Sequence, residues 1–338
     1  MTHSLGPVML DIAGTSLDEH DRRLLQDSSL GGVILFARNV EDPAQVRALC
    51  EAIRSERADL LLAIDQEGGR VQRLREGVTR LPPMAVFGEL HASAPDDAIG
   101  FARDAGWLLG MEMAACGLDF SFAPVLDVDD DRCPAIGNRA FSADPELVAT
   151  LAGAFIEGLH EAGMAAVGKH YPGHGGVALD SHLTLPEDAR SFDEIRQRDL
   201  IPFERLASRL DAVMPAHVRY PDFDRRPAGF SPSWLGLLRE TIGFKGAIIS
   251  DDLSMQGAHV AGGPGDRARA AIEAGCDMVL MCNDRDAAGE ALAALEFNHE
   301  RARRLSRLRY TRARPSLEAL EALTRWRRTH ARLQALSS

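Results

Sequence analysis

Lysine is almost absent from this chain. Its 338 residues include 38 Lys and Arg side chains, of which only Lys169 and Lys245 are lysines. Lysine carries a compact ammonium on a flexible stem, whereas arginine presents a planar guanidinium, so the two residues are not interchangeable at a binding site. Lys169 therefore stands out as a residue that a site has selected for its ammonium group.

The chain also lacks the marks of an exported or membrane protein. Its five cysteines are odd in number and form no C-x-x-C pair, which is typical of reduced, buried thiols rather than of a disulfide framework. It has no basic segment followed by an apolar run at its start, and no run of about 18 apolar residues, the length that spans a bilayer. We therefore expect a soluble, cytoplasmic protein.

The chain as a whole is negatively charged, but its C-terminal segment carries an excess of positive charge. The net charge of −12 excludes a general nucleic-acid binder. Residues 300–338 nevertheless hold 11 arginines against three glutamates. Such a tail is also typical of a nucleic-acid or membrane arm. Apolar residues at near-helical spacing favour instead a pair of helices packed on the body: Leu305, Leu308, Leu317, Leu320, Leu323, Trp326 and Leu333. We expect neither nucleic acid nor membrane as a partner.

Short apolar runs alternate with longer amphipathic stretches along the chain. The runs are Val8–Leu10, Gly32–Phe36, Leu60–Ile64, Phe120–Leu126, Ala165–Gly168, Ala212–Met214, Gly246–Ile249 and Met278–Met281. The amphipathic stretches include Pro43–Arg57, Ala98–Cys116, Pro145–Ala162, Asp193–Ser208 and Arg267–Ala274. Near-continuous apolar strands between helices predict a parallel sheet buried on both faces.

Eight such strands are the number that closes a (β/α)8 barrel. We predict an α/β fold with a single barrel domain over residues 1–338. The barrel itself covers about 1–297, and extra C-terminal helices follow over about 298–336. A doubly wound open sheet is the alternative. No G-x-G-x-x-G motif follows the first strand, so nothing supports dinucleotide binding.

Polar residues stand where nearly every predicted strand ends. They are Asp11, Asp65, Asp127, Lys169 with His170, His217, Ser250 with Asp251 and Asp252, and Asn283. Any one of them alone is equally well explained as a helix cap or a loop anchor. In a barrel, however, the carboxyl ends of all strands meet on one face, where such enzymes keep their catalytic groups. The pattern therefore places an active site at that face.

The loop that follows the fifth strand is the most informative segment. Lys169-His170-Tyr171-Pro172-Gly173-His174-Gly175-Gly176 is closed by Asp180-Ser181-His182, so ionisable side chains alternate with helix breakers. A surface turn with solvated histidines is the simpler reading. Loops that carry ionisable groups on a rigid scaffold are, however, typical of catalytic sites. We expect its glycines to give the backbone freedom to move His182.

Five segments together resemble glycoside hydrolase family 3, in particular its bacterial β-N-acetylhexosaminidases of the cytoplasmic cell-wall-recycling type. They are Asp65–Arg73, Ala123–Asp127, Ile136–Arg139, Lys169–His182 and Ser250–Met255, and the resemblance covers nearly the whole chain. It implies a nucleophile at Asp251 and a general acid/base at His182, assisted by Asp180.

The same resemblance implies the substrate. Substrate contacts fall on Asp65, Arg73, Arg139, Lys169 and His170, and the sugar is β-1,4-linked GlcNAc on 1,6-anhydro-N-acetylmuramic acid, with or without its peptide. No cofactor and no metal are implied, the partner is the small muropeptide or amino-sugar substrate, and we expect a monomer.

Elementary chemistry agrees with these roles. Retaining glycosidases need a carboxylate on one side of the anomeric carbon and a proton donor on the other. A strand end fixes Asp251 firmly, whereas Asp252 points the other way and is expected to anchor the next loop. A histidine titrates near neutrality, and an adjacent carboxylate such as Asp180 raises the pKa of His182 and fixes its tautomer.

Three other functions compete with this interpretation. His170-x-x-x-His174 has zinc-ligand spacing, but Pro172-Gly173 prevents the helix on which such a pair normally sits. A phosphorylase acting on the same glycosides is a second alternative, since a histidine repels incoming phosphate less than a carboxylate does. The third is a non-catalytic amino-sugar-binding protein, which would need neither Asp251 nor the His182/Asp180 pair.

Two arginines near the predicted site allow structural explanations as well. We expect Arg70 to belong to an ion-pair network at a strand end rather than to contact substrate. Arg139 follows a Gly-Asn turn and is expected to reach into the cleft from its loop.

Overall fold

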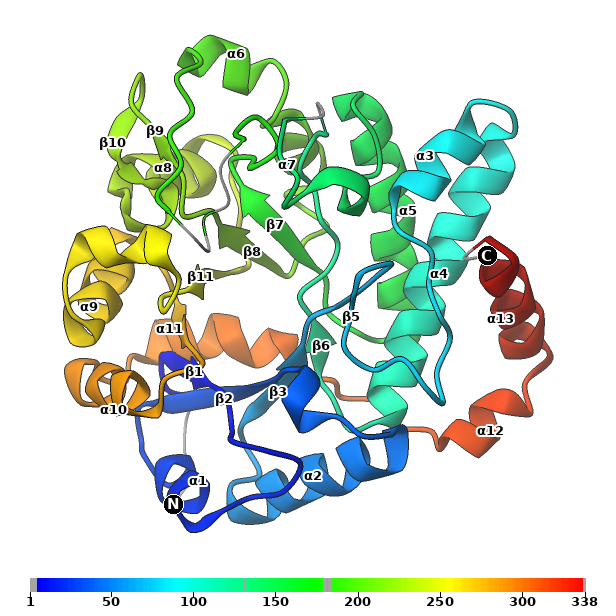
Figure 1. Ribbon diagram of the computed structural model, residues 1–338, viewed down its shortest axis with the longest axis horizontal. Helices are drawn as coiled ribbons and strands as arrows, with labels where there is room; N and C mark the ends of the chain where they lie inside the picture. Colours follow the sequence, from blue (N-terminus) through cyan, green and yellow to red (C-terminus); the bar gives the residue numbers. More distant parts are fainter. Residues whose placement is uncertain (1–4, 130–131, 179–180, 182–183, 337–338) are drawn as a thin grey trace.

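A computed structural model describes residues 5–129, 132–178, 181 and 184–336. Within them, eight parallel strands form one sheet in the order β6-β3-β2-β1-β12-β11-β8-β7 (Figure 1). The strands are β1 (Val8–Leu10), β2 (Leu30–Leu35), β3 (Leu61–Ile64), β6 (Phe120–Ser121), β7 (Val167–Tyr171), β8 (Ala212–Pro215), β11 (Ala247–Asp252) and β12 (Met278–Met281). Parallel bridges from Phe120 to Ala165 and from Val125 to Lys169 join the two edges. The sheet is therefore a nearly closed barrel, as the eight apolar runs predicted.

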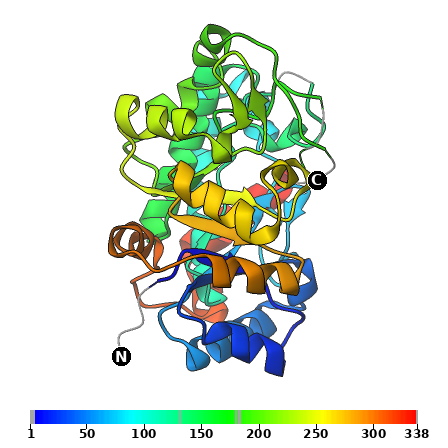
Figure 2. The same cartoon turned by 90° about the vertical axis from the view of Figure 1, so that its left-hand side faces the viewer.

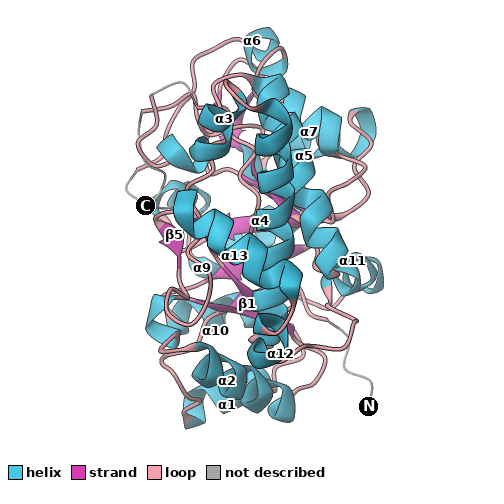
Figure 3. Ribbon diagram, turned by 90° about the vertical axis from the view of Figure 1, so that its right-hand side faces the viewer, coloured by secondary structure: helices cyan, strands magenta, loops and turns pink. Residues whose placement is uncertain are grey.

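Helices connect successive strands and cover the outside of the barrel (Figures 2 and 3). In chain order they are α1 (Glu19–Leu25), α2 (Pro43–Glu56), α3 (Ala85–His91), α4 (Pro95–Ala115), α5 (Pro145–Ala162), α6 (Phe192–Arg196), α7 (Ile201–Leu206), α8 (Pro232–Gly236), α9 (Pro264–Ala274) and α10 (Arg285–Ala294). Many begin at a side-chain cap; the Asp42 carboxylate, for example, accepts the backbone N–H of Gln45. After the barrel come α11 (His299–Leu305), α12 (Leu317–Glu321) and α13 (Thr324–Leu336).

Three local predictions need correction. The strand expected over Phe120–Leu126 is regular only at Phe120–Ser121, because Pro124 has no N–H to donate to a ladder. The helix expected over Asp193–Ser208 is divided into α6 and α7, and Pro202 lies in the first turn of the second helix. The strand expected at Ala165–Gly168 instead covers Val167–Tyr171, so Lys169 and His170 lie within the strand.

Two antiparallel hairpins on strand-to-helix connections were not predicted. They are β4 (Gln66–Gly68) with β5 (Val71–Gln72), and β9 (Arg219–Tyr220) with β10 (Asp224–Pro227). Their strands have only two to four residues and carry charged or amide side chains, so they lack the apolar alternation by which strands are recognised. The first hairpin immediately follows β3 and carries side chains of the site described below.

The Arg-rich C-terminal segment packs on the barrel, in agreement with its leucine spacing. Helix α13 lies along α4 (Figure 3). Its Arg325 guanidinium lies 4.0 Å from the Trp107 ring centroid, and Arg332 lies 4.0 Å from that of Phe101. Arg325 also pairs with Glu161 at 2.8 Å. The tail's positive charge is thus directed at aromatic and acidic groups of the chain itself.

A buried carboxyl joins α4, α13 and the segment after β5. Glu112 accepts hydrogen bonds from the backbone N–H and hydroxyl of Thr79 and from the Trp326 indole at 3.0 Å. The Thr79 hydroxyl also lies 2.7 Å from His330 Nδ1. Burial raises the pKa of Glu112 to about 7, although these hydrogen bonds oppose the shift. Folding therefore favours the protonated form of the Glu112 carboxyl.

This carboxyl should make stability fall with rising pH. The folded pKa of Glu112 lies above its ordinary value of 4.5, so its stabilising contribution is complete below that pH and lost as the pH rises through about 7. We expect Glu112→Gln, which is neutral throughout, to gain in free energy of unfolding relative to the parent protein between about pH 5 and about pH 8. Urea unfolding at both pH values measures the difference. A pH-independent difference would contradict the assignment.

Two further observations concern the cysteines and the possibility of a membrane-spanning helix. The five cysteines are all buried thiols. Among the described residues, no helix combines the length and the apolar character needed to cross a bilayer.

Candidate active site

A cavity of about 380 Å³ opens where the strands of the barrel end. Phe36, Phe122, Met214 and Met255 contribute apolar walls. Its ionisable and amide side chains come from strands and connections far apart in sequence: Asp65, Glu67, Arg73, Arg139, Lys169, His170, Asp251, Asp252 and Asn283. All five residues predicted to contact substrate, and Asp251, therefore line one cavity. Asp180 and His182 lie outside the described residues.

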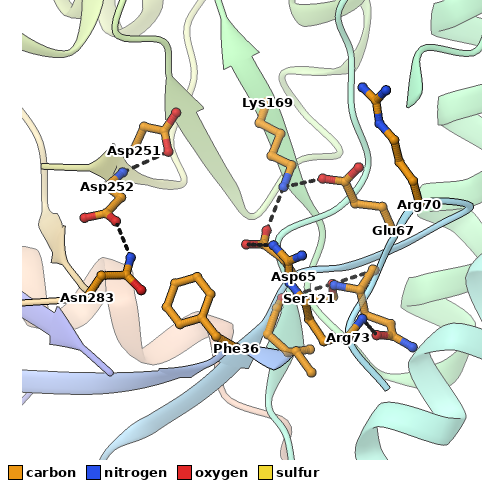
Figure 4. Close-up of polar contacts among 12 residues, drawn as sticks. Phe36, Asp65, Glu67, Arg70, Arg73, Ser121, Lys169, Asp251, Asp252 and Asn283 are labelled. Atoms are coloured by element: carbon orange, nitrogen blue, oxygen red, sulfur yellow. Dashed lines mark hydrogen bonds and ion pairs between the residues drawn. The ribbon is translucent and has the colours of Figure 1, made fainter. Parts of the chain in front are cut away.

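Two groups of polar and charged side chains lie on opposite sides in Figure 4. Asp251, Asp252 and Asn283 stand on one side, and Lys169 stands with Asp65, Glu67 and Arg73 on the other. The first group comes from β11 and the end of β12. The second comes from β7 and from the β4–β5 hairpin with its approach from β3.

Lys169 is the centre of the second group. Its ammonium lies 2.9 Å from Asp65 Oδ1 and 2.7 Å from Glu67 Oε1. Arg139 binds the same Glu67 through two parallel hydrogen bonds, of 2.9 and 2.8 Å. An ammonium has three N–H donors, and two here are directed at carboxylates. One donor remains for a ligand hydroxyl.

Strong coupling keeps these buried groups charged. Burial alone would raise the pKa of Glu67, but Arg139 and Lys169 outweigh it and hold that pKa well below its usual range. Burial would likewise lower the pKa of Lys169, yet Asp65 and Glu67 together raise it. The chain's rare lysine is therefore a permanently charged, fixed donor.

Arg73 reaches the cavity from just beyond the hairpin. Its Nη2 lies 3.5 Å from Asp65 Oδ2. Its Nε is buried and has no hydrogen-bond partner among the described residues. A buried donor without a partner costs free energy unless something else accepts its hydrogen bond. The Arg73 side chain is 29% exposed, so its Nη groups, rather than the buried Nε, can donate to a bound molecule, and Asp65 beside it can accept.

His170 is held by the strand-end carboxylate Asp127. His170 Nδ1 lies 2.7 Å from Asp127 Oδ2, while Asp127 Oδ1 accepts the backbone N–H groups of His170 and His174. Burial would raise the pKa of Asp127, but the neighbouring histidines lower it. An ionised Asp127 fixes the imidazole orientation of His170, leaving Nε2 for the cavity.

The adjacent carboxylates Asp251 and Asp252 have different surroundings. Asp252 accepts four hydrogen bonds, from Ser254 N, Ser254 Oγ, Cys282 N and Asn283 Nδ2, at 2.9, 2.7, 3.1 and 3.2 Å. Asp251 Oδ1 accepts the N–H of Asp252 at 2.8 Å, which orients its carboxylate (Figure 4). Asp252 therefore anchors the following loop, as predicted, and also binds the segment after β12. Its side chain nevertheless lines the cavity and does not point away from it as alternation suggested.

Asp11, the aspartate that follows β1, also has a structural role. Asp11 accepts the backbone N–H of Asn283 at 2.9 Å and forms an ion pair with Arg38. Arg38 in turn donates to the Asn283 side chain at 2.9 Å. Asp11 therefore fixes the connection after β12 and does not line the cavity.

Sequence reasoning missed one central residue and misread another. Glu67 was not singled out, although it lies two residues after Asp65 on the connection from β3, a spacing that places both side chains on the same side of an extended chain. Arg70 was expected in an ion-pair network. Its guanidinium instead donates to the carbonyls of Pro134, Ala135 and Ile136, and so ties the hairpin to the loop that carries Arg139.

An oriented carboxylate at a barrel strand end, facing a rigid cluster of donors and acceptors suited to hydroxyl groups, defines a barrel enzyme that acts on carbohydrate. Comparisons with known proteins agree. Residues 8–308 match the model of the glycosyl hydrolase family 3 N-terminal domain. The chain belongs to glycosyl hydrolase family 3 and is a glycosidase.

Individual relatives are similar over most of their length. The beta-hexosaminidase of Pseudomonas aeruginosa strain LESB58 is 59% identical over 292 residues, which are 86% of each chain. NagZ from Neisseria gonorrhoeae, solved in complex with N-trifluoroacetyl-D-glucosamine, is 44% identical with a TM-score of 0.94 and 99% of each chain covered. A structure of the same Neisseria protein with a zinc ion is 42% identical, with a TM-score of 0.92 and 99% coverage of both chains.

Removing the charge of Glu67 should weaken sugar binding. Glu67→Gln leaves two buried cations, Lys169 and Arg139, with one carboxylate fewer, and breaking a buried ion pair typically costs about 3–5 kcal/mol. We expect at least about a tenfold increase in the dissociation constant for GlcNAc, measured by calorimetry. Arg103→Gln, which removes the exposed ion pair with Glu161 and does not line the cavity, should leave the affinity unchanged. Equal effects of the two substitutions would contradict a binding role for the cluster.

Proposed function

We propose that this chain is a retaining exo-β-N-acetylglucosaminidase. It removes β-1,4-linked GlcNAc from 1,6-anhydro-N-acetylmuramic acid, with or without the peptide, in the cytoplasm during cell-wall recycling. The fold and family carry the glycosidase activity. The amino-sugar specificity is supported by the names of the relatives and by the N-acylated glucosamine bound to the Neisseria protein.

One observation carries the mechanism: the difference between Asp251 and Asp252. The carboxylate of Asp252 accepts four hydrogen bonds, two from Ser254 in its own loop and two from Cys282 and Asn283 after β12, which spreads its charge and makes it a poor nucleophile. Asp251 lines the cavity on the side opposite the Lys169 cluster. In our proposal, Asp251 attacks the anomeric carbon, the bond to the aglycone oxygen breaks, and a covalent glycosyl-enzyme forms.

His182 is proposed to protonate the departing oxygen and then to deprotonate the attacking water, with Asp180 tuning its basicity. Both residues lie outside the described residues, so their support is the sequence resemblance. The surroundings of the other strand-end carboxylates favour this choice indirectly. Asp127 is engaged by His170 and His174, and Asp11 by Asn283 and Arg38.

Sugar recognition is assigned to the opposite side of the cavity. Lys169, His170 and Arg73 are proposed to donate to hydroxyl groups, and Asp65 to accept from them. Arg139 lines the cavity, but both of its bonds to Glu67 use its guanidinium fork, so we propose that it chiefly fixes the cluster.

The charges of the cavity favour water over phosphate as the acceptor. Its cations, Lys169, Arg73 and Arg139, are outnumbered by its acidic side chains, Asp65, Glu67, Asp251 and Asp252. A phosphorylase would need a net positive place for a dianion. Product analysis with GlcNAc–anhydro-MurNAc, with and without phosphate, tests this proposal. GlcNAc should form in both cases, and GlcNAc 1-phosphate as the main product would establish the phosphorylase.

Activity is expected to require no metal. His174 has Cys133 Sγ 3.4 Å from Nδ1 and Ser181 Oγ 3.0 Å from Nε2, so both of its ring nitrogens already have protein partners. His170 and His174 are therefore poor as a zinc pair. Prolonged dialysis against a strong chelator should leave kcat unchanged. If activity disappears and zinc restores it, a metal-assisted reaction replaces the glycosidase mechanism.

A further inference from the structure

His174 makes a series of polar contacts with Asp127, Cys133 and Ser181, although the proposed chemistry does not use this residue. Its backbone N–H donates to Asp127 Oδ1 at 2.7 Å. Its Nδ1 lies 3.4 Å from Cys133 Sγ, and its Nε2 lies 3.0 Å from Ser181 Oγ. The side chain is buried and does not line the cavity, so it is held in place without being presented to substrate.

Ser181 is the last residue in this series of contacts, and two of its polar groups, the hydroxyl and the carbonyl, have partners. Besides the hydroxyl contact to His174, its carbonyl accepts the backbone N–H of Gly257 at 3.0 Å. Gly257 follows β11, the strand that carries Asp251. A Cβ at position 257 would lie 3.1 Å from that carbonyl and from His217, a tight contact that glycine avoids. Ser181 is thereby tied both to the loop after β7 and to the segment after the nucleophile strand.

The backbone between His170 and His174 is packed rather than loose. Gly173 has a φ of +143°, and a Cβ there would lie 2.6 Å from the Asp199 side chain. A Cβ on Gly175 would lie 2.0 Å from the Val128 carbonyl oxygen. These two glycines permit close packing, and the movement of His182 expected from the sequence concerns a residue outside the described ranges. The support under His174 is therefore rigid.

We propose that His174 is a positioning residue for the acid/base group, acting through Ser181. This inference rests on the proposed function. Ser181 is the covalent neighbour of both Asp180 and His182, so in this proposal the contacts to its hydroxyl and its carbonyl restrain the acid/base pair. Through its backbone N–H, His174 shares Asp127 with His170 of the sugar-binding side, and Gly257 connects Ser181 to the nucleophile side. The His174 side chain supplies the contact to Ser181, whereas the links to Asp127 and to Gly257 are made by backbone groups of His174 and Ser181.

The test removes the contact between His174 and Ser181 by substituting either residue. It then compares the loss of kcat/KM on two substrates that differ in their leaving groups. His174→Leu and Ser181→Ala each delete it, whereas His174→Gln retains a donor that can reach the hydroxyl. Each variant is assayed for kcat/KM, which reports the glycosylation step, on GlcNAc–anhydro-MurNAc and on 2,4-dinitrophenyl β-GlcNAc. The first leaving group needs a proton and the second does not.

We expect His174→Leu and Ser181→Ala to lower kcat/KM on the disaccharide by at least about tenfold, a part of the roughly 10²–10⁴-fold effect of general acid catalysis. The aryl glycoside should change by less than about threefold, and His174→Gln should recover most of the loss. The double variant should be no worse than the poorer single variant, because both changes remove one contact.

For the His174 and Ser181 variants, either of two outcomes would overturn the proposal. A loss of equal size on both substrates would show that His174 only maintains the cavity, and additive effects in the double variant would show that the two residues act separately. Thermal unfolding of every variant identifies those that do not fold. If His174→Leu does not fold, the leaving-group comparison for His174→Gln and Ser181→Ala tests the proposal. His182→Ala, assayed in parallel, shows the full leaving-group effect. Its absence there would overturn the acid/base assignment itself, and this inference with it.

Discussion

Asp251→Asn is expected to abolish turnover, with a loss on the order of 10⁴-fold or more, as is usual when a covalent nucleophile is removed. The substitution is nearly isosteric and retains an oxygen to accept the N–H of Asp252. The fold and the sugar-binding cluster should therefore persist. Steady-state assays on an aryl GlcNAc glycoside measure the loss, and calorimetry with GlcNAc checks that binding survives.

Asp252→Asn is the matched control, one residue along the same strand. Its NH2 group replaces one carboxylate oxygen, so it faces either the N–H groups of Ser254 and Cys282, which share Oδ1, or the Ser254 hydroxyl and the Asn283 amide, which share Oδ2. A buried donor left unsatisfied costs about 1–3 kcal/mol. We expect a lower melting temperature and a much smaller loss of turnover than for Asp251→Asn.

A fluorinated GlcNAc donor should trap the intermediate and label Asp251, as read by peptide mass spectrometry. The same adduct should form on Asp252→Asn. The first product formed from a β-glycoside should be the β-anomer, by NMR, since two inversions give retention. An adduct on Asp252, or an α-anomeric first product, is incompatible with the proposal. If the substrate's own acetamide is the nucleophile, no protein adduct forms.

The barrel was predictable because its signal is local and repeated. Each strand is buried on both faces, so it reads as a short apolar run, and helices with one apolar face separate the runs. Polar groups at strand ends such as Asp65, Asp127 and Asp251 then had to converge, since parallel strands end on one face. Strand count and site location follow from that rule without knowledge of individual contacts.

Pairings between side chains were not predictable in the same way. Glu67 binds Lys169 and Arg139, which lie about a hundred and about seventy residues further along the chain, and no local pattern encodes such distances. Arg70 was misread for the same reason, because its partners are backbone carbonyls of a distant loop. The assignment of Asp251 as nucleophile came from the family resemblance, and strand alternation suggested only that Asp252 anchors the next loop. Both side chains line the same cavity, so alternation alone does not separate them.

The acid/base assignment makes the second large prediction. Since general acid catalysis contributes about 10²–10⁴-fold, His182→Ala should lower kcat/KM on the natural disaccharide by that amount. The loss should shrink for glycosylation by an aryl glycoside, whose leaving group needs little protonation. Comparing kcat/KM on both substrates separates loss of proton transfer from loss of binding, which would lower both alike.

Asp180→Asn probes the partner of that histidine. The amide retains a hydrogen bond but removes a charge, so the pKa of the imidazole should fall and the pH–rate profile should move to more acidic values. Full pH profiles of kcat/KM for the parent and for Asp180→Asn measure the shift. Near-normal turnover of His182→Ala on the disaccharide, or equal losses on both leaving groups, would make His182 a binding residue. The search for the donor would then return to Asp127 and Asp11, where it would have to explain how carboxylates already engaged by His170, His174, Asn283 and Arg38 become available to a departing oxygen.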